Sequence, residues 1–506
     1  MTTTFDMVAK TFQGLEAVLA DELRALGAED VAPGKRMVAF RGDLALLYKA
    51  NMCCRTALRI LKPFYSFEAG DADELYAKVK EYDWSTLMDV NKTFSIDTVT
   101  NSAEFKHSQF VTYRVKDAIV DWFRDHDETE RRPSVRLEGA DIMINVHISE
   151  HHVTLSLDSS GESLHRRGWR TAQTEAPINE VLAAGIILMT GWRGETPFVD
   201  PMCGSGTFAI EAAMIAAGIN PGVYRKHFAF ENWPDFNADL LEEIYNDDSG
   251  EREVTCPIIA ADIQPRAIAI ARDNAKSAGV ERFITFETKS ITTWETAPQP
   301  AGVLVTNPPY GKRIGADDMN ALYRGIGSVL KRVFTGYHAW IIGYEDEYFH
   351  EIGLAPSQKI AVNNGGLECE LREYLLFAGN KKTFRAEGGK LKDERRAERP
   401  ERKPRFNDRD RRKDAKDSRK DAKGSDKRRG DDRRKPMRDG AKPAAKFGGK
   451  RAERPQEKEQ ESGRRPFRMS ATPQMPSIPA DKEIVLNRPA WRTRKKRDEN
   501  SENNDK

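Results

Sequence analysis

The chain has 506 residues, of which 39% are hydrophobic, and its 81 Lys and Arg nearly balance 79 Asp and Glu. A chain of this length holds about two to four domains. Five cysteines without metal-ligand spacing indicate a reduced cytoplasmic protein and argue against a disulfide scaffold or a metal site. No export signal is expected at the N-terminus, and the longest apolar stretch, residues 181–192, is too short to cross a bilayer, so we expect no membrane partner.

The charge divides the chain into an acidic body and a basic tail. From residue 381 onward there are 43 Lys and Arg against 24 Asp and Glu, which leaves 38 and 55 of the totals in residues 1–380. The net charge is therefore −17 for the body and +19 for the tail. The tail has too few apolar residues for a core, so residues 381–506 are predicted to be disordered.

Strands and helices alternate through the first 157 residues. Apolar patterning predicts strands over residues 7–9, 37–40, 58–61 and 94–99 and a strand pair within 142–157. It predicts helices over residues 15–26, 44–50, 73–82 and 109–124. This alternation is typical of one or two small α+β modules.

A basic segment with one aromatic residue follows these modules. Its candidate contact residues are Arg166, Arg167, Trp169 and Arg170. Arginines bind phosphates and an indole ring offers a stacking surface, so the segment favours contact with a nucleic acid. The alternative is an ordinary charged linker between domains. A helix is predicted to begin near residue 176 and to lead into the next domain.

A glycine turn then joins a short apolar strand to an amphipathic helix. The strand ends at Asp200, and the turn Cys203-Gly204-Ser205-Gly206 precedes the helix that opens at Thr207. Glycines allow a close approach of the backbone to a ligand, and a helix N-terminus offers free N–H groups. This order of elements suits a nucleotide-type cofactor, although a glycine pair alone is weak evidence.

A second apolar strand, residues 257–261, ends at Asp262 and Ile263. A carboxylate at the tip of the second strand of a doubly wound sheet is a usual partner of ribose hydroxyls. The alternative is an ordinary helix N-cap at Asp262. Phosphate-binding signatures are missing, because there is no Gly-Lys-Ser/Thr and the glycine spacing is not that of a dinucleotide site. A cofactor with a ribose but no phosphate fits best.

The strand predicted over residues 303–306 leads into Asn307-Pro308-Pro309-Tyr310. Two prolines remove two N–H groups, so their carbonyls can stay free as acceptors, while the Asn side chain adds an acceptor and the Tyr an aromatic face. An exocyclic amino group of a planar base fits this set. The alternative is a simple strand terminator. Further strands are predicted over residues 338–342, 357–362 and 370–378.

Together these motifs resemble those of class I methyltransferases that use S-adenosylmethionine to methylate exocyclic amines. The resemblance assigns to the cofactor the residues Asp200, Cys203, Gly204, Gly206, Thr207, Asp262, Ile263 and Asn307. It assigns Asn307, Pro308 and Tyr310 to the target amine. One departure is Ser290, which stands after the third strand where such enzymes often keep an Asp for the adenine amine. The amine motif itself is shared by enzymes that act on DNA adenine, protein glutamine and RNA guanine.

The N-terminal half decides among these substrates, because it resembles the RNA-binding THUMP domain. The whole of residues 1–380 is similar to the THUMP-containing guanine-N2 RNA methyltransferases, which implies 23S rRNA or a pre-50S particle as partner and adds Lys312 and Arg313 to the RNA-binding set. The implied domains are a ferredoxin-like domain at 1–60, a THUMP domain at 61–160, a seven-stranded doubly wound methyltransferase domain at 161–380 and the tail at 381–506.

Two other functions stay open at this point. A DNA adenine-N6 methyltransferase would share the amine motif but would carry a sequence-reading domain in place of the THUMP-like module. A non-catalytic RNA-binding factor in ribosome assembly would explain the N-terminal half and the tail, but it would leave residues 307–310 without a role.

The charge asymmetry generates a prediction for the tail. If it tethers RNA, deletion of the residues after Gly388 will weaken RNA binding and make its dependence on salt shallower, because fewer cations are released from the phosphates. Filter binding of 23S rRNA fragments between 50 and about 200 mM salt measures both effects. An unchanged salt slope would mean that the tail is only a solvated linker.

Overall fold

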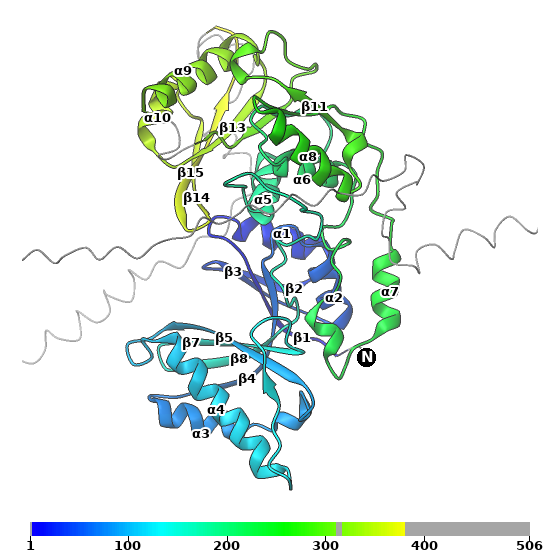
Figure 1. The fold of residues 1–506 in the computed structure, drawn as a ribbon, viewed down its shortest axis with the longest axis vertical. Coiled ribbons are helices and arrows are strands. Elements are labelled where there is room, and N and C mark those ends of the chain that lie inside the picture. Colours follow the sequence, from blue (N-terminus) through cyan, green and yellow to red (C-terminus); the bar gives the residue numbers. More distant parts are fainter. Residues whose placement is uncertain (1–2, 310–315, 380–506) are drawn as a thin grey trace, which may run out of the picture. The chain divides into compact units, whose positions relative to one another are not determined.

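The structure, a computed structural model, describes residues 3–309 and 316–379, which form two β-sheets with their helices (Figure 1). The prediction of a disordered tail at 381–506 falls outside these residues. In the ranges that are described, no helix combines the length and the apolar character needed to span a membrane.

The N-terminal sheet has eight strands in the order β2-β3-β1-β4-β8-β7-β5-β6. Their bounds are β1 Phe5–Lys10, β2 Glu29–Gly34, β3 Met37–Gly42, β4 Arg59–Glu68, β5 Thr93–Asn101, β6 Ser134–Val135, β7 Ile142–Ser149 and β8 His152–Asp158. The long strand β4 joins the two halves, because Leu61 pairs with Val8 of β1 on one side and with Asp158 of β8 on the other. The predicted modules therefore share one sheet, and the strand expected at 58–61 continues to Glu68.

Four helices pack against this sheet: α1 Glu16–Ala25, α2 Leu44–Cys53, α3 Ala72–Glu81 and α4 Ser108–His126. Two of them begin at aspartates that cap free backbone donors. The Asp43 side chain accepts a hydrogen bond from the Leu46 N–H, and Asp71 accepts from the first turn of α3. The inward faces of the helices contribute fully buried side chains such as Leu47 and Val115 to a common core.

The second sheet has seven strands in the order β11-β10-β9-β12-β13-β15-β14. Their bounds are β9 Phe198–Asp200, β10 Ile258–Asp262, β11 Ile284–Thr288, β12 Val303–Thr306, β13 His338–Gly343, β14 Gln358–Asn364 and β15 Leu367–Leu375. Strands β9 to β13 run parallel, whereas β15 is antiparallel to both of its neighbours. This arrangement confirms the predicted doubly wound seven-stranded fold.

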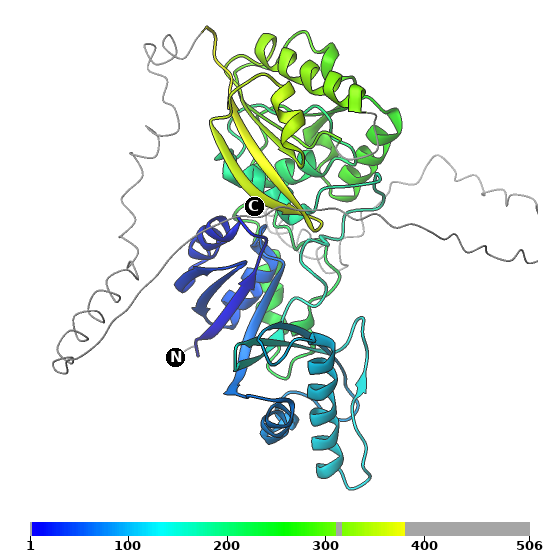
Figure 2. The ribbon, with the colours of Figure 1, turned by 90° about the vertical axis from the view of Figure 1, so that its left-hand side faces the viewer.

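Helices cover both faces of this sheet, as the turned view in Figure 2 shows. The helices are α5 Glu180–Thr190, α6 Thr207–Ala216, α8 Pro265–Ser277, α9 Ala316–Arg332 and α10 Asp346–Glu351. Two separate apolar clusters lie beneath them. Val305 of β12 packs in the cluster under α5, α6 and α8, and its neighbour Leu304 packs in the cluster under α9 and α10. Successive residues of a strand point to opposite faces, so both must be apolar.

An insertion of the second domain packs into the core of the first. It contains the short helix η2 Ala229–Asn232 and the helix α7 Ala238–Asn246. The ring of Phe230 stacks on Tyr48 of α2 with centroids 4.2 Å apart, and the Asn237 N–H donates to the Tyr48 hydroxyl at 3.0 Å. The Lys62 ammonium of β4 pairs with Asp235 at 3.0 Å. The insertion therefore holds the second domain to the N-terminal sheet through a shared aromatic core.

The packing of α9 on α10 generates a prediction from two glycines of one helix. A methyl group at Gly327 would lie 2.0 Å from the Ile352 carbonyl oxygen, whereas at Gly325 the nearest atom would be a Thr292 methyl carbon at 2.8 Å. Gly327→Ala will therefore lower the free energy of unfolding by about 2 kcal/mol despite its better helix propensity. Gly325→Ala is the control and will cost less than half as much in urea unfolding. Equal losses would contradict the packing argument.

Candidate methyltransferase site

The predicted site residues lie at the carboxyl ends of three neighbouring parallel strands. Asp200 ends β9, Asp262 ends β10, and Asn307 follows β12 directly. Strand β9 lies between the other two, with Ala260 of β10 paired to Asp200 and Val303 of β12 paired to Phe198. The structure thus brings the three side chains to one edge of the sheet, where doubly wound folds bind ligands.

The glycine turn folds tightly between β9 and α6. The Cys203 N–H donates to the Ala261 carbonyl at 2.8 Å, and the Gly206 N–H donates to the Cys203 carbonyl at 2.8 Å. Gly206 has φ +82°, and a methyl group there would lie 2.9 Å from the Ala271 side chain on α8. Glycine is therefore needed for the packing of α6 on α8.

Asp262 holds the glycine turn with its carboxylate. One oxygen accepts a hydrogen bond from the Gly204 N–H at 3.0 Å, and the other accepts from the Gln264 N–H at 2.9 Å. The N-cap of α8 is Gln264, so Asp262 is not the helix N-cap that was the alternative interpretation. Beside it, Ile263 is 67% exposed, which places an apolar surface next to the carboxylate. This pair suits a ligand with a ribose and a planar base.

Asp200 is almost fully buried at the end of β9. Its carboxylate accepts hydrogen bonds from the Thr306 hydroxyl at 3.1 Å and from the Met202 N–H at 3.3 Å. Burial, with a smaller contribution from the negative charge of Asp262, raises the pKa of Asp200 to about 8. Burial also raises the pKa of the nearby Cys203 thiol, which stays neutral.

Asn307 carries an unused acceptor. Its side-chain oxygen is buried, and no hydrogen-bond partner for it lies within the described part of the chain. A buried amide oxygen without a donor costs free energy, and this oxygen can accept a hydrogen bond from an N–H group of a ligand. Pro308 follows it and is buried. Tyr310, Lys312 and Arg313 lie outside the described residues.

Two residues of the basic segment do not lie on the RNA-contacting surface that its composition predicted. Arg167 is 2% exposed and pairs with Glu211 of α6 at 3.3 Å, and Trp169 is fully buried. The prediction of an RNA contact is therefore wrong for these two residues, because their side chains are used in the core between the domains. Arg166 is exposed and pairs with Glu162.

Arg170 is also turned inward. Its guanidinium donates to Glu180 of α5 at 2.6 Å, to the Ser205 hydroxyl at 2.9 Å and to the Thr207 hydroxyl at 2.8 Å. The side chain therefore supports the glycine turn instead of facing RNA. A signal in the sequence could have found this role: α5 and α6 are apolar helices that contain one acidic residue each, Glu180 and Glu211. A single acid in an apolar helix requires a buried cation as partner.

Ser290, which replaces the usual aspartate, caps the short helix η4 Ile291–Thr293. Its hydroxyl oxygen accepts a hydrogen bond from the Thr292 N–H at 3.3 Å. The side chain thus has a local structural role at the end of β11, and nothing in the structure assigns it to an adenine amine. Among the residues described, no group of three or more His, Cys, Asp and Glu side chains could hold a metal ion.

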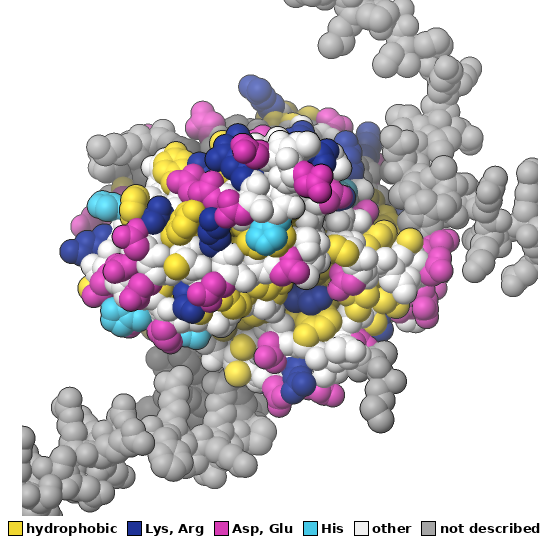
Figure 3. Space-filling view, turned by 90° about the horizontal axis from the view of Figure 1, so that it is seen from below, with side chains coloured by type: hydrophobic (Ala, Val, Ile, Leu, Met, Phe, Trp, Pro, Cys, Tyr) yellow, Lys and Arg dark blue, Asp and Glu magenta, His cyan; other side chains and the backbone are white. Residues whose placement is uncertain are grey.

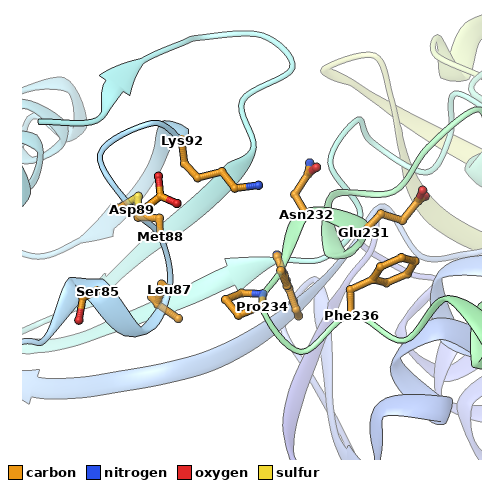
Figure 4. Close-up of a pocket in the computed structure, with 10 residues that line it drawn as sticks. Ser85, Leu87, Met88, Asp89, Lys92, Glu231, Asn232, Pro234 and Phe236 are labelled. Atoms are coloured by element: carbon orange, nitrogen blue, oxygen red, sulfur yellow. The ribbon is translucent and has the colours of Figure 1, made fainter.

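A groove away from this site separates the loop after η1 Trp84–Thr86 from the insertion (Figure 4). Its volume is about 460 Å³, and its charged lining residues are Lys92, Asp89 and Glu231. Two carboxylates against one ammonium do not favour phosphate. On the face in Figure 3, which carries α3 and α4, Lys and Arg alternate with Asp and Glu. Net charge therefore does not mark an RNA surface there.

The chain matches known proteins along most of the described length. Residues 167–373 match the family described as RMKL-like, methyltransferase domain, residues 69–158 match the THUMP domain, and residues 6–61 match the RlmL ferredoxin-like domain. A putative RNA methyltransferase of Synechocystis sp. is 41% identical over 378 residues, which are 74% of this chain and 98% of that protein. The chain belongs to the family of THUMP-containing, RMKL-like RNA methyltransferases.

Two further relatives support membership of this THUMP methyltransferase family. A ribosomal RNA large subunit methyltransferase K/L of Syntrophotalea carbinolica is 39% identical over 72% of this chain, and the match spans about half (52%) of that longer protein. The crystal structure of SMU.472, a putative methyltransferase complexed with SAH, is 30% identical with a TM-score of 0.67 and covers 75% of this chain and all (100%) of that one. The predicted resemblance and the predicted cofactor, S-adenosylmethionine, are confirmed.

The buried carboxyl group of Asp200 generates a prediction on pH. The folded protein keeps a proton on this group that the unfolded chain releases near pH 4, so its contribution to stability is lost as the pH rises towards about 8. Asp200→Asn removes this titration. The melting temperature of the variant minus that of the natural protein will be higher at pH 8.5 than at pH 5, by about 3 °C or more.

Differential scanning fluorimetry across this pH range measures the difference. The exposed Asp273 on α8 provides the matched control, since Asp273→Asn should give a constant offset. A constant offset for Asp200→Asn as well would show that the buried carboxyl does not titrate in this range.

Proposed function

We propose that the protein transfers a methyl group from S-adenosylmethionine to the exocyclic N2 amine of a guanine in 23S rRNA or in a pre-50S particle. Family membership makes it an S-adenosylmethionine-dependent RNA methyltransferase. The observation that supports an amine as acceptor is the buried Asn307 oxygen without a donor, at the end of β12. The 23S rRNA as substrate is supported by the printed name of the Syntrophotalea relative and by the THUMP domain.

The chemistry of a guanine amine explains why such an acceptor is needed. The lone pair of N2 is delocalised into the ring, so the nitrogen is a poor nucleophile. Acceptors at the Asn307 oxygen and the Pro308 carbonyl would bind its two hydrogens and draw electron density back to nitrogen. The bond from N2 to the methyl carbon would form as the carbon–sulfur bond breaks, and one N2 proton would be released to water. Tyr310 would stack on the base. Positioning of this kind lowers barriers by roughly 7–11 kcal/mol, so a strongly shifted general base is not required.

The cofactor supplies a methyl group on a sulfonium centre. We assign its binding to the residues that carry the turn and the strand ends: Asp200, Cys203, Gly204, Gly206, Thr207, Asp262, Ile263 and Asn307. This assignment is supported by the Gly204 N–H and Asp262 beside the exposed apolar Ile263, and by Asn307 at the end of β12, on the other side of β9. The guanine would have to leave its stack to reach this edge of the sheet.

We also propose the division of the chain into a ferredoxin-like domain at 1–60, a THUMP domain at 61–160, a methyltransferase domain at 161–380 and a tail at 381–506. The three family matches support the first three domains. Strand β4, Arg59–Glu68, crosses the boundary at residue 60. A cytoplasmic location is part of the same proposal, since ribosomal RNA is the substrate and the five cysteines are free thiols.

The test of the function is mass spectrometry of ribosomal RNA from a strain that lacks the gene. One N2-methylguanine will be missing from 23S rRNA and will return when the natural protein is expressed. Loss of N6-methyladenine from DNA with an intact 23S rRNA would support the DNA alternative. No change in either nucleic acid would favour a non-catalytic RNA-binding factor.

The role of Asn307 gives a prediction for the purified protein. Asn307→Ala will lower kcat by about a hundredfold or more, because one acceptor for the developing charge is lost. Calorimetry will show affinity for S-adenosylhomocysteine within about threefold of the natural value. Asn246→Ala, at the exposed end of α7, is the control and will keep full activity. Near-normal turnover of Asn307→Ala would exclude the assigned role.

A further inference from the structure

Residues 167–174 carry the chain from the N-terminal sheet across the cofactor turn. At the start of this segment, Arg167 donates to the Arg55 carbonyl and to the Leu164 carbonyl, and its guanidinium contacts Glu211 on α6. At its end, the Thr174 hydroxyl lies 3.4 Å from the position that a methyl group on Gly204 would take. The segment therefore lies directly against the turn that we assign to S-adenosylmethionine.

Arg170 stands in the middle of this segment and contacts three elements of the second domain. Its Nε donates to Glu180 of α5, its Nη1 to the Ser205 hydroxyl inside the turn, and its Nη2 to the Thr207 hydroxyl on the first residue of α6. The planar guanidinium has donors in fixed directions, so it sets the positions of these three acceptors relative to one another. Only 18% of the side chain is exposed, and it also lies over the Trp169 ring at 5.0 Å.

A second tie joins the same segment to the same turn. The Asn274 side chain of α8 donates to the Ser205 carbonyl at 3.0 Å and to the Ala172 carbonyl at 2.9 Å. Its oxygen accepts from the Thr171 N–H at 2.9 Å. Asn274 is fully buried, and its bonds to the segment and to Ser205 hold both against α8. Ser205 is thus fixed through its hydroxyl by Arg170 and through its carbonyl by Asn274.

We propose that Arg170 is a positioning residue for the cofactor, which keeps the Cys203–Thr207 turn in the shape that binds S-adenosylmethionine. This inference rests on the assignment of that turn to the cofactor under the proposed function. Without the guanidinium, Ser205 and Thr207 lose their common donor, and the turn between them must be ordered anew each time the cofactor binds. The cost of that ordering appears as weaker binding.

Arg170→Lys tests this role in the full-length protein. A lysine keeps the positive charge but has one compact ammonium group, which cannot reach Glu180, Ser205 and Thr207 in one plane. Calorimetry with S-adenosylhomocysteine is expected to show binding about tenfold weaker than in the natural protein, a loss typical of one charge-assisted hydrogen bond. The KM for S-adenosylmethionine will rise by a similar factor, while kcat at saturating cofactor stays within about twofold.

The split between KM and kcat separates positioning from a merely structural role. If Arg170 only stabilised the fold, the variant would lose melting temperature and active fraction, which lowers the apparent kcat and leaves KM unchanged. Arg324→Lys is the matched control, because Arg324 forms an exposed pair with Glu351 at 3.0 Å in the same domain. Its KM, kcat and affinity for S-adenosylhomocysteine should equal those of the natural protein.

Two further variants keep each outcome decisive. Asp262→Asn tests the assigned site: unchanged affinity in this variant would show that the cofactor binds elsewhere and would overturn the proposed site. Weaker binding in Asp262→Asn together with natural affinity in Arg170→Lys would overturn only the role of Arg170. If Arg170→Lys does not fold, Glu180→Gln decides, because it loosens the same guanidinium and should weaken binding about threefold. Natural affinity in Glu180→Gln would then overturn the proposal.

Discussion

The hydrogen bond from the Gly204 N–H to the Asp262 carboxylate connects the two halves of the proposed cofactor site. Gly204 belongs to the turn after β9, and Asp262 ends the neighbouring strand β10. On the other side of β9, the bond from Thr306 to Asp200 connects the end of β12 to the same centre. Side chains thus join the carboxyl ends of the three parallel strands β10, β9 and β12. Asn307 is held in position because it follows β12 directly. A shift of any one of these strands would therefore move both the glycine turn and the side-chain oxygen of Asn307.

The buried charges between the domains add a second constraint. Arg167 and Glu211 are both buried, and Glu22 accepts hydrogen bonds from the Arg55 and Thr56 N–H groups. Burial raises the pKa of Glu22 and Glu211 and lowers that of Arg55, so desolvation opposes these charges. Ion pairs of this kind add little to stability beyond what apolar residues would give. Their effect is directional: each arginine has several fixed acceptors, and together they define one path for the chain between the sheets.

The strands and the motif positions could be predicted because they depend on local signals. An apolar run that ends in Asp200, Asp262 or Asn307 has few other structures open to it once the chain alternates strands and helices. The burial of side chains in the basic segment could not be predicted in this way. Arg167 finds its partner Glu211 44 residues later in the sequence, and composition alone makes a buried arginine look like an exposed one. The extension of β4 beyond residue 61 could not be predicted for a similar reason, since its partner strand β8 lies far along the chain.

The inward direction of these side chains changes how the body can contact RNA. Residues 1–380 carry a net charge of −17, and two arginines of the predicted RNA surface, Arg167 and Arg170, are neutralised by Glu211 and Glu180 inside the protein. Long-range attraction of phosphates by the body is therefore weak or absent. At short range a protein can still recognise RNA through its shape and through the stacking of unpaired bases, neither of which needs a positive net charge. The cations in residues 381–506, with their net charge of +19, are the ones in this chain that can supply attraction at a distance.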